Sequence, residues 1–218
     1  AAVTEDGLTG GGGLRCTAGE VWLRDVRVTD SLAGLGGGIY ASDGCDLTLD
    51  GVTVDGSTAH HGGGIYASDA AGLTITDSLI QDNTADSSVE ADRFKEGEDH
   101  AFGGGLYLYG LNGALLRDTT LARNTITHED YARGGGAYIS QCDGCTLEQV
   151  TALGNTITDD AGSSTQTGAY GGGLSISSSD DLTISGSTVD GNTLYGRLRA
   201  QGAGLVLFGG SRLTLSDS

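Results

Sequence analysis

Apolar and polar residues alternate with a period of two in short segments separated by Gly, Asp and Ser. After the glycine run 62–64, the apolar positions fall at 65 and 67, at 73 and 75, and at 80. Alternation of this kind between turn residues is typical of short β-strands. The pattern predicts three short strands in this part of the chain, near residues 65–67, 73–75 and 78–80.

The same unit recurs along the chain. GGGIYAS stands at 36–42 and again at 62–68, and weaker copies begin at Gly11, Gly103, Gly134, Gly171 and Gly202. Self-similarity at such spacings indicates a repeat architecture. Because the repeat runs from one end to the other, we expect residues 1–218 to form a single domain.

No helical pattern connects the strands, so each unit has to bury its apolar side by coiling. Equivalent strands of successive turns then stack in parallel about 4.8 Å apart. The sequence therefore predicts an all-β fold, a right-handed single-stranded parallel β-helix (solenoid) of about seven rungs with three short strands per rung. An antiparallel sandwich or propeller is the alternative, but unequal repeat lengths with a constant internal phase disfavour it.

One inward column is polar, and it consists of Ser31, Ser57, Asn83, Asn124, Asn155 and Asn192. Stacked Asn side chains can hydrogen-bond from rung to rung, as they do in cross-β ladders. Asn is also a common turn residue that tolerates the left-handed conformation. Both interpretations give this column a structural role.

Nearly all the extra length of the longer repeats lies between this polar column and the next glycine run. In a solenoid that position is one corner, and insertions on one face commonly build a binding surface. The longest insertion spans 84–102 and carries Glu90, Asp92, Arg93, Lys95, Glu96, Glu98, Asp99 and His100.

The motif GGGIYAS, followed by LIQDNTA, TLARNTI or TVDGNTL, resembles the repeats of bacterial parallel β-helix surface proteins. The nearest named pattern is the GGA(I/L) and FxxN pair of polymorphic outer-membrane autotransporter passengers. Here the Phe of FxxN is Ile80, Leu121, Ala152 or Val189. The resemblance covers essentially the whole chain and implies an extracellular or bacterial cell-surface location, often with an adhesive role.

The formal charge of -18, with Lys95 as the only lysine, argues against binding to nucleic acid or anionic membranes, since both need basic patches. It suits an extracellular or high-salt setting. No apolar run approaches the roughly 18 residues of a transmembrane helix. The beginning Ala-Ala-Val, without a signal-like segment, is what a mature secreted fragment would show.

Four cysteines predict disulfides in an oxidising compartment. Cys142 and Cys145 form a CxxC motif, for which a structural disulfide is favoured over redox or zinc chemistry. Cys16 and Cys45 lie on adjacent repeats and can form the other bridge.

Tyrosines follow the inward residue of several glycine strands and should form a stripe on one outer face. The stripe comprises Tyr40, Tyr66, Tyr107 and Tyr138, with Tyr109 as an extension. Tyr presents an apolar ring with a polar tip, which suits the binding of an extended polysaccharide. The favoured interpretation is that the rings only stack on one another and stabilise the sheet, since Tyr is part of the ordinary repeat motif.

The histidines His60, His61, His100 and His128 all lie in the variable corner, near Asp99, Glu129, Asp130, Asp159 and Asp160. Their spacing fits no metal or acid–base motif, so we expect solvated polar loops, no metal site and no required cofactor. Binding of Ca²⁺ by the acidic loops remains open, because Ca²⁺ prefers oxygen ligands.

Two classes of function follow. The favoured one is a secreted or cell-surface structural or adhesive element whose partners are other surface proteins, glycans or further copies of itself. The competing class is a polysaccharide lyase or glycosidase, with Arg93, Lys95 and Arg133 near Asp99 and Asp130 as available groups. No lyase or hydrolase motif connects these residues, so no catalytic residue is predicted.

The two ends of the chain have matching phases. Val3 and Asp6 correspond to Val189 and Asn192, while Leu213, Leu215 and Ser218 correspond to positions of the preceding rung. This predicts either a window of a longer solenoid or subunits that stack head to tail into a filament.

Overall fold

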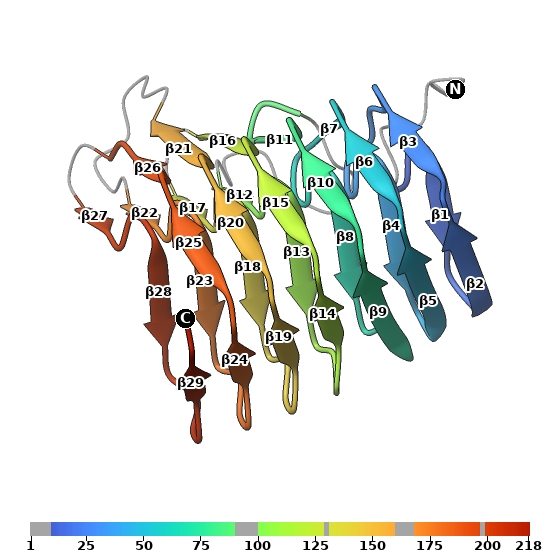
Figure 1. The fold of residues 1–218 in the computed structure, drawn as a ribbon. Helices are drawn as coiled ribbons and strands as arrows, with labels where there is room; N and C mark the ends of the chain where they lie inside the picture. Colours follow the sequence, from blue (N-terminus) through green and yellow to red (C-terminus); the bar gives the residue numbers. More distant parts are fainter. Residues whose placement is uncertain (1–9, 90–99, 129–130, 160–167, 197–198) are drawn as a thin grey trace.

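The computed structural model describes residues 10–89, 100–128, 131–159, 168–196 and 199–218. The regular secondary structure of these residues consists of β-strands, without a helix. All pairings between these strands are parallel, and each strand pairs with its counterpart in the next turn of the chain. Figure 1 shows the successive rungs side by side, from blue at the N-terminus to red at the C-terminus. The predicted all-β parallel β-helix is confirmed.

Three long sheets form the body of the solenoid. Sheet I begins each rung after the glycine run and contains β1 (Leu14–Cys16), β4 (Ile39–Ser42), β8 (Ile65–Ser68), β13 (Leu106–Tyr109), β18 (Ala137–Ser140), β23 (Leu174–Ser177) and β28 (Leu205–Phe208). Sheet II contains β2 (Gly19–Arg24), β5 (Cys45–Asp50), β9 (Gly72–Thr76), β14 (Leu115–Arg117), β19 (Thr146–Glu148), β24 (Thr183–Ser185) and β29 (Thr214–Ser216). Sheet III contains β3 (Arg27–Thr29), β6 (Thr53–Asp55), β10 (Leu79–Gln81), β15 (Thr120–Ala122), β20 (Thr151–Leu153) and β25 (Thr188–Asp190).

The variable corner adds two further sheets that the prediction of three strands per rung did not contain. Sheet IV contains β7 (Thr58–Ala59), β11 (Thr84–Asp86), β16 (Thr125–His128), β21 (Thr156–Asp159) and β26 (Thr193–Leu194). Sheet V contains β12 (His100–Phe102), β17 (Tyr131–Arg133), β22 (Gly168–Tyr170) and β27 (Arg199–Gln201). Together they form an extension of the body, which we call the arm.

The body is filled by apolar side chains that repeat in the same place in every rung. Ile65 of β8 pairs with Ile39 on one side and Leu106 on the other, and all three are fully buried. Because successive strand residues point to opposite faces, the following tyrosine points outward. The predicted assignment of Ile65 to the inside is confirmed.

Corners are formed by residues in the left-handed conformation. Every strand of sheets II and III is followed directly by a residue with positive φ, as Asp25, Gly51 and Asp77 are after β2, β5 and β9. Gly adopts this conformation freely, and the short polar side chain of Asp tolerates it better than most residues. The recurring Asp and Gly between the strands therefore turn the chain at fixed points.

The polar column stacks between sheets III and IV. The side-chain amide of Asn124 donates hydrogen bonds to Asn155 Oδ1 at 3.0 Å and to the carbonyl oxygen of Ile80 at 2.9 Å. Its own Oδ1 accepts from the backbone and side-chain nitrogens of Asn83, both at 3.1 Å. Asn83, Asn124 and Asn155 are completely buried, so these bonds satisfy groups that would otherwise be costly to bury.

The glycine run lies at the neck between body and arm. A Cβ at Gly63 would clash with the carbonyl oxygen of Gly104 in the next rung and with the backbone of Thr84, where β11 leaves the body. Only a residue without a side chain fits between these two segments. The run therefore lets each rung close while the chain continues into the arm.

The arm has a small core of its own. Its buried residues Ala85, Ile126 and Ile157 of sheet IV pack with Ala101, Ala132 and Ala169 of sheet V. Alanine on one side keeps the two sheets close together. The described residues of the variable corner in sheets IV and V are therefore packed against one another.

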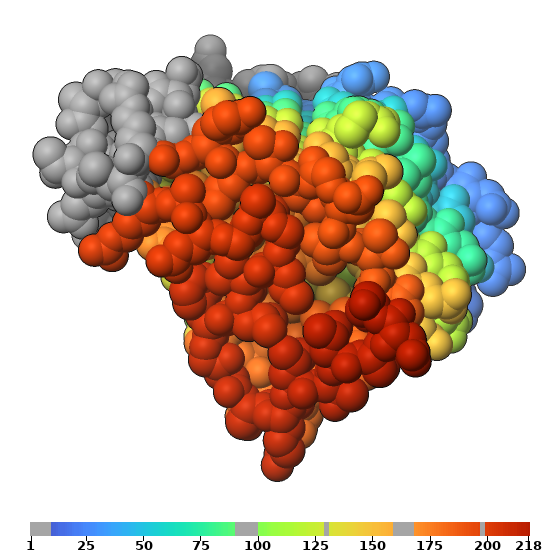
Figure 2. Space-filling model, turned by 60° about the vertical axis from the view of Figure 1, so that its left-hand side comes forward, coloured from blue at the N-terminus to red at the C-terminus, as the bar shows by residue number. Residues whose placement is uncertain are grey.

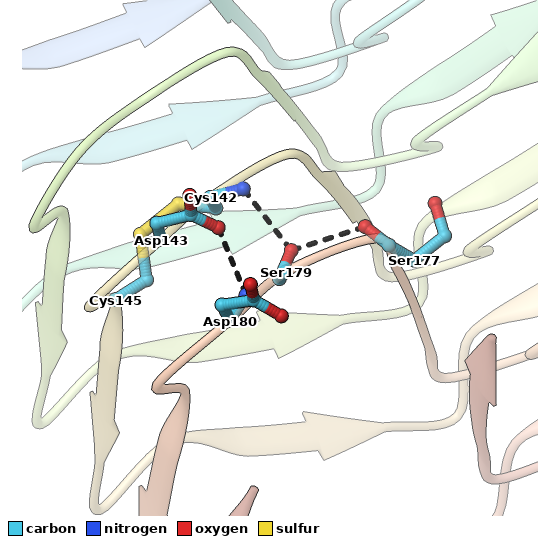
Figure 3. The surroundings of a disulfide bond; sticks show 6 residues. All are labelled: Cys142, Asp143, Cys145, Ser177, Ser179 and Asp180. Atoms are coloured by element: carbon cyan, nitrogen blue, oxygen red, sulfur yellow. Dashed lines mark hydrogen bonds between the residues drawn. A yellow bond between two sulfur atoms is a disulfide. The ribbon is translucent and has the colours of Figure 1, made fainter. Parts of the chain in front are cut away.

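Both predicted disulfides are present. Cys16 at the end of β1 is bonded to Cys45 at the start of β5, and Cys142 is bonded to Cys145 in the corner between β18 and β19. All four cysteines are buried. Figure 3 shows the second bridge, where the backbone N–H of Cys142 donates to Ser179 Oγ at 3.1 Å in the next rung. A buried, hydrogen-bonded bridge of this kind supports a structural role over a redox role.

The C-terminal face of the last rung faces the viewer in Figure 2. A cavity of about 330 Å³ there is lined by inward residues that include Leu174, Ile184, Leu205 and Leu215. Leu215 is exposed. Head-to-tail stacking of subunits stays a prediction.

We expect Asn124→Ala to lower the free energy of unfolding by about 3 kcal/mol, since it removes four hydrogen bonds within a buried network, each worth about 1 kcal/mol net. Urea unfolding followed by circular dichroism measures the change. Asn112→Ala, at an exposed turn position, is the control and should change stability little. Equal effects of the two substitutions would contradict a stabilising ladder.

Candidate functional site

Aromatic side chains gather where the outer faces of sheets I and V meet. Phe102 of β12 lies with its ring centroid 5.2 Å from that of Tyr138 and 6.3 Å from that of Tyr107, both on sheet I. Farther along, Tyr170 of β22 lies 5.3 Å from Phe208 of β28 and 5.3 Å from Tyr131 of β17. We call this group the aromatic seam: Phe102, Tyr107, Tyr131, Tyr138, Tyr170 and Phe208, with Arg133 among them.

The seam follows from strand alternation in sheet V. In β12, β17 and β22 the middle residue is an alanine that points into the arm core, so its two neighbours point outward. Gly168 occupies an outward position, where a Cβ would lie 3.0 Å from Cε2 of Tyr170 and 3.2 Å from Cδ2 of Tyr131. The missing side chain leaves room for both rings.

The predicted tyrosine stripe runs along sheet I and contributes Tyr107 and Tyr138 to the seam. Its rings stack from Tyr40 to Tyr107, and the ring of Tyr138 is tilted by 50° against that of Tyr107. Ring centroids are 5.4 Å apart for Tyr40 and Tyr66, 4.8 Å for Tyr66 and Tyr107, and 5.5 Å for Tyr107 and Tyr138. Tyr109 lies 6.4 Å from Tyr107. Tyr40 and Tyr138 are only 3% and 9% exposed, so the stripe is not the continuous exposed platform that the polysaccharide interpretation assumed. Sheet V covers part of it, because Phe102 lies against Tyr107 and Tyr138.

Arg133 lies among the four seam rings of Tyr131, Tyr138, Tyr170 and Phe208. Its guanidinium carbon lies 4.7 Å from the ring centroid of Phe208 and between 5.1 and 5.7 Å from those of Tyr131, Tyr138 and Tyr170. Nε donates to the Tyr131 hydroxyl at 2.7 Å, one terminal nitrogen donates to the same hydroxyl, and the other donates to the Tyr138 hydroxyl at 3.5 Å. These contacts hold a cation against four aromatic rings.

The hydroxyls of Tyr107 and Tyr131 stay protonated at neutral pH. Burial, followed by the neighbouring Tyr66 and Tyr138, raises the pKa of Tyr107 far above its ordinary value. Burial also raises the pKa of Tyr131, although Arg133 acts in the opposite direction. Neutral phenols donate and accept hydrogen bonds but do not abstract protons near pH 7. The seam therefore has the chemistry of a binding surface.

The histidines differ from the expected solvated loop residues. His60, His61 and His128 are buried, because the corner folds into sheets IV and V. His61 stacks on Phe102 and Tyr107 at centroid distances of 4.9 and 5.7 Å, which places it at one end of the seam. Its Nδ1 accepts a hydrogen bond from the backbone N–H of Phe102 at 3.2 Å.

Several candidate residues lie outside the part of the chain that the structure describes. They are the insertion residues Glu90, Asp92, Arg93, Lys95, Glu96, Glu98 and Asp99, together with Glu129, Asp130 and Asp160. Of the groups considered for a lyase, only Arg133 is placed. Within the described residues, no group of three or more His, Cys, Asp or Glu side chains is arranged to hold a metal ion, and no helix is long and apolar enough to cross a membrane.

A comparison with protein families agrees with this architecture. A family model described as a right handed beta helix region matches residues 8–218. The chain therefore belongs to the right-handed β-helix family. No curated protein and no solved structure matches this right-handed β-helix significantly. The narrower resemblance to polymorphic outer-membrane autotransporter passengers stays a prediction.

Sequence reasoning missed half of the site in this right-handed β-helix. Phe102 and Arg133 were noted only as part of an insertion and as an available base, and Tyr131, Tyr170 and Phe208 were not noted. The available signal is an alanine two residues before Gly103, Gly134, Gly171 and Gly202, with larger residues on both sides in HAF and YAR. An alternation over only three residues is too short to predict a β-strand from the sequence, and the strand is recognised only when its pairing with a neighbouring strand is known.

Replacing Ser175 tests whether a buried hydroxyl group in the tyrosine column lowers the stability of the protein. Ser175 lies between Tyr138 and Val206, it is 0% exposed, and its hydroxyl has no hydrogen-bond partner among the described residues. We expect Ser175→Ala to raise the free energy of unfolding by up to about 1 kcal/mol, since it removes an unpaired buried hydroxyl. A clear loss of stability in urea unfolding would show that the hydroxyl is satisfied.

Stability should fall when the pH drops from 7.5 to 5. Burial, followed by the neighbouring His60 and His100, lowers the pKa of His61 well below 6.5, and burial also lowers the pKa of His60, which Asp86 opposes. The unfolded chain therefore takes up protons first, and each unit of difference in pKa is worth about 1.4 kcal/mol. Protonation of His61 at Nδ1 would also break the bond from Phe102.

Urea unfolding of the wild-type protein and of His61→Gln at both pH values measures this effect. The wild type should lose more stability than the variant. An equal loss in both proteins would contradict a contribution from His61.

Proposed function

We propose that this right-handed β-helix is an extracellular glycan-binding protein that acts in adhesion through the aromatic seam. The observation that carries the proposal is the convergence of six rings from two sheets, with Phe102, Tyr107 and Tyr131 all partly exposed. Tyr and Phe rings bury the apolar faces of sugars, and tyrosine hydroxyls bond with sugar hydroxyls.

The length and rigidity of the seam suit an extended chain better than a single sugar. Its rings come from successive rungs that are locked in register by the backbone ladder, as Tyr107 and Tyr138 are on sheet I. A site on paired strands loses little conformational entropy on binding, which favours affinity. The two disulfides support an oxidising, extracellular setting.

A binding role is favoured over polysaccharide cleavage. Cleavage by a glycosidase needs a pair of carboxyl groups beside the sugar, and the described residues of the seam are aromatic apart from Arg133. The elevated pKa values of Tyr107 and Tyr131 remove these phenols as general bases at neutral pH.

A glycan array, followed by calorimetry on each glycan that binds, tests the proposal. Tyr131→Ala should weaken binding tenfold or more, as removal of a central aromatic anchor commonly does. Tyr195→Ala is the matched control, since Tyr195 is an exposed tyrosine in the arm outside the seam. It should bind like the wild type.

Three results would overturn the proposal. The first is the absence of binding to every glycan on the array. The second is unchanged binding by Tyr131→Ala, which would place the site elsewhere. The third is release of shorter products when the bound glycan is incubated with the protein, which would favour the enzyme alternative.

A further inference from the structure

Arg133 differs from most of the other arginines whose contacts the structure describes. Arg15 also lies over a ring, that of Tyr40 at 5.3 Å, but Arg133 lies against four rings. Arg24, Arg27, Arg117, Arg123 and Arg212 each pair with an aspartate, such as Arg123 with Asp82 at 2.6 Å. Among the described residues, no carboxylate pairs with Arg133, although the chain has 29 acidic residues and only 11 Lys and Arg. Its partners are aromatic rings and tyrosine hydroxyls.

The guanidinium also keeps hydrogen-bonding capacity. A guanidinium has five N–H donors. Three bonds use the Nε donor and one donor on each terminal nitrogen, toward Tyr131 and Tyr138. One donor on each terminal nitrogen is left without an acceptor among the described residues. Two donors on a planar group match the two oxygens of a carboxylate.

The rings fix the position of this charge. Tyr131 and Tyr138 hold the guanidinium through their hydroxyls, and the Tyr138 hydroxyl lies 3.0 Å from Ser177 Oγ, which donates to Ser140 Oγ at 3.0 Å. Hydrogen bonds therefore run from the sheet I serines to Arg133. Arg133 is partly exposed, so it combines a fixed orientation with access for a ligand.

We propose that the seam selects acidic glycans, with Arg133 binding the carboxylate of a uronic acid residue while neighbouring rings contact the sugar. This inference rests on the proposed glycan binding and adds the chemical class of the ligand. The net charge of -18 does not prevent it. At physiological salt, exposed charges farther away than about 8 Å are largely screened. The local contact with Arg133 therefore determines whether a carboxylate binds at the seam.

Calorimetry with matched oligosaccharides tests this selectivity. The probes are tetrasaccharides of galacturonic, mannuronic and glucuronic acid, each beside its carboxyl-reduced counterpart, and one sulfated tetrasaccharide. At least one uronate should bind the wild type tenfold or more tightly than its reduced counterpart. This preference should weaken as salt is raised.

Two substitutions and one control locate the effect. Arg133→Gln should abolish the preference, and Arg133→Lys should keep only part of it, because an ammonium lacks the planar pair of donors. Arg117→Gln makes the same charge change on the outer face of sheet II and should leave binding unchanged. Circular dichroism and thermal unfolding verify that each variant is folded.

The outcomes separate the two proposals. Equal binding of a uronate and its reduced counterpart would overturn the role of the carboxylate and leave glycan binding intact. Tighter binding of the sulfated probe than of any uronate would also overturn it, as would an unchanged preference in folded Arg133→Gln. The absence of binding to any probe or to any arrayed glycan would overturn both proposals.

Discussion

The buried asparagine ladder is the constraint on which the rest of this solenoid depends. Asn83, Asn124 and Asn155 each donate to the Asn of the next rung and to a carbonyl oxygen of the rung before. A rung shifted by one residue would put a neighbour such as Arg123 or Thr125 in this column in place of Asn124, and it would turn the apolar residues of its strands from the core to the surface. The ladder thus keeps every rung in the same register.

Constant register turns sequence repeats into columns in space. Tyrosines of successive rungs stack on sheet I, and the alanines of sheet V line up inside the arm. The glycines at the neck, such as Gly63, let the chain leave the body at the same point in each rung. Sheet V is thereby held beside sheet I. The aromatic seam forms because the outward side chains of these two rigid sheets meet along their common border.

The period-2 pattern at Ile65 and Tyr66 and the recurrence of Asn83 were enough to predict the solenoid, its inward columns and the corner that carries the insertions. The arm was not predictable in the same way. HAF, YAR and GAY share little beyond their alanine, and the insertions before them differ in length, so nothing local shows that they pair. Arg133 and Tyr170 come together only through that pairing, which is a property of the fold rather than of a motif.

The most direct test of the account is a crystal structure of the protein with a bound uronate oligosaccharide. We predict a sugar ring against the partly exposed Tyr131, with its carboxylate about 2.8 Å from the terminal nitrogens of Arg133. An oligosaccharide bound elsewhere, for example beside the exposed Trp22 of sheet II, with the seam free, would contradict the central claim.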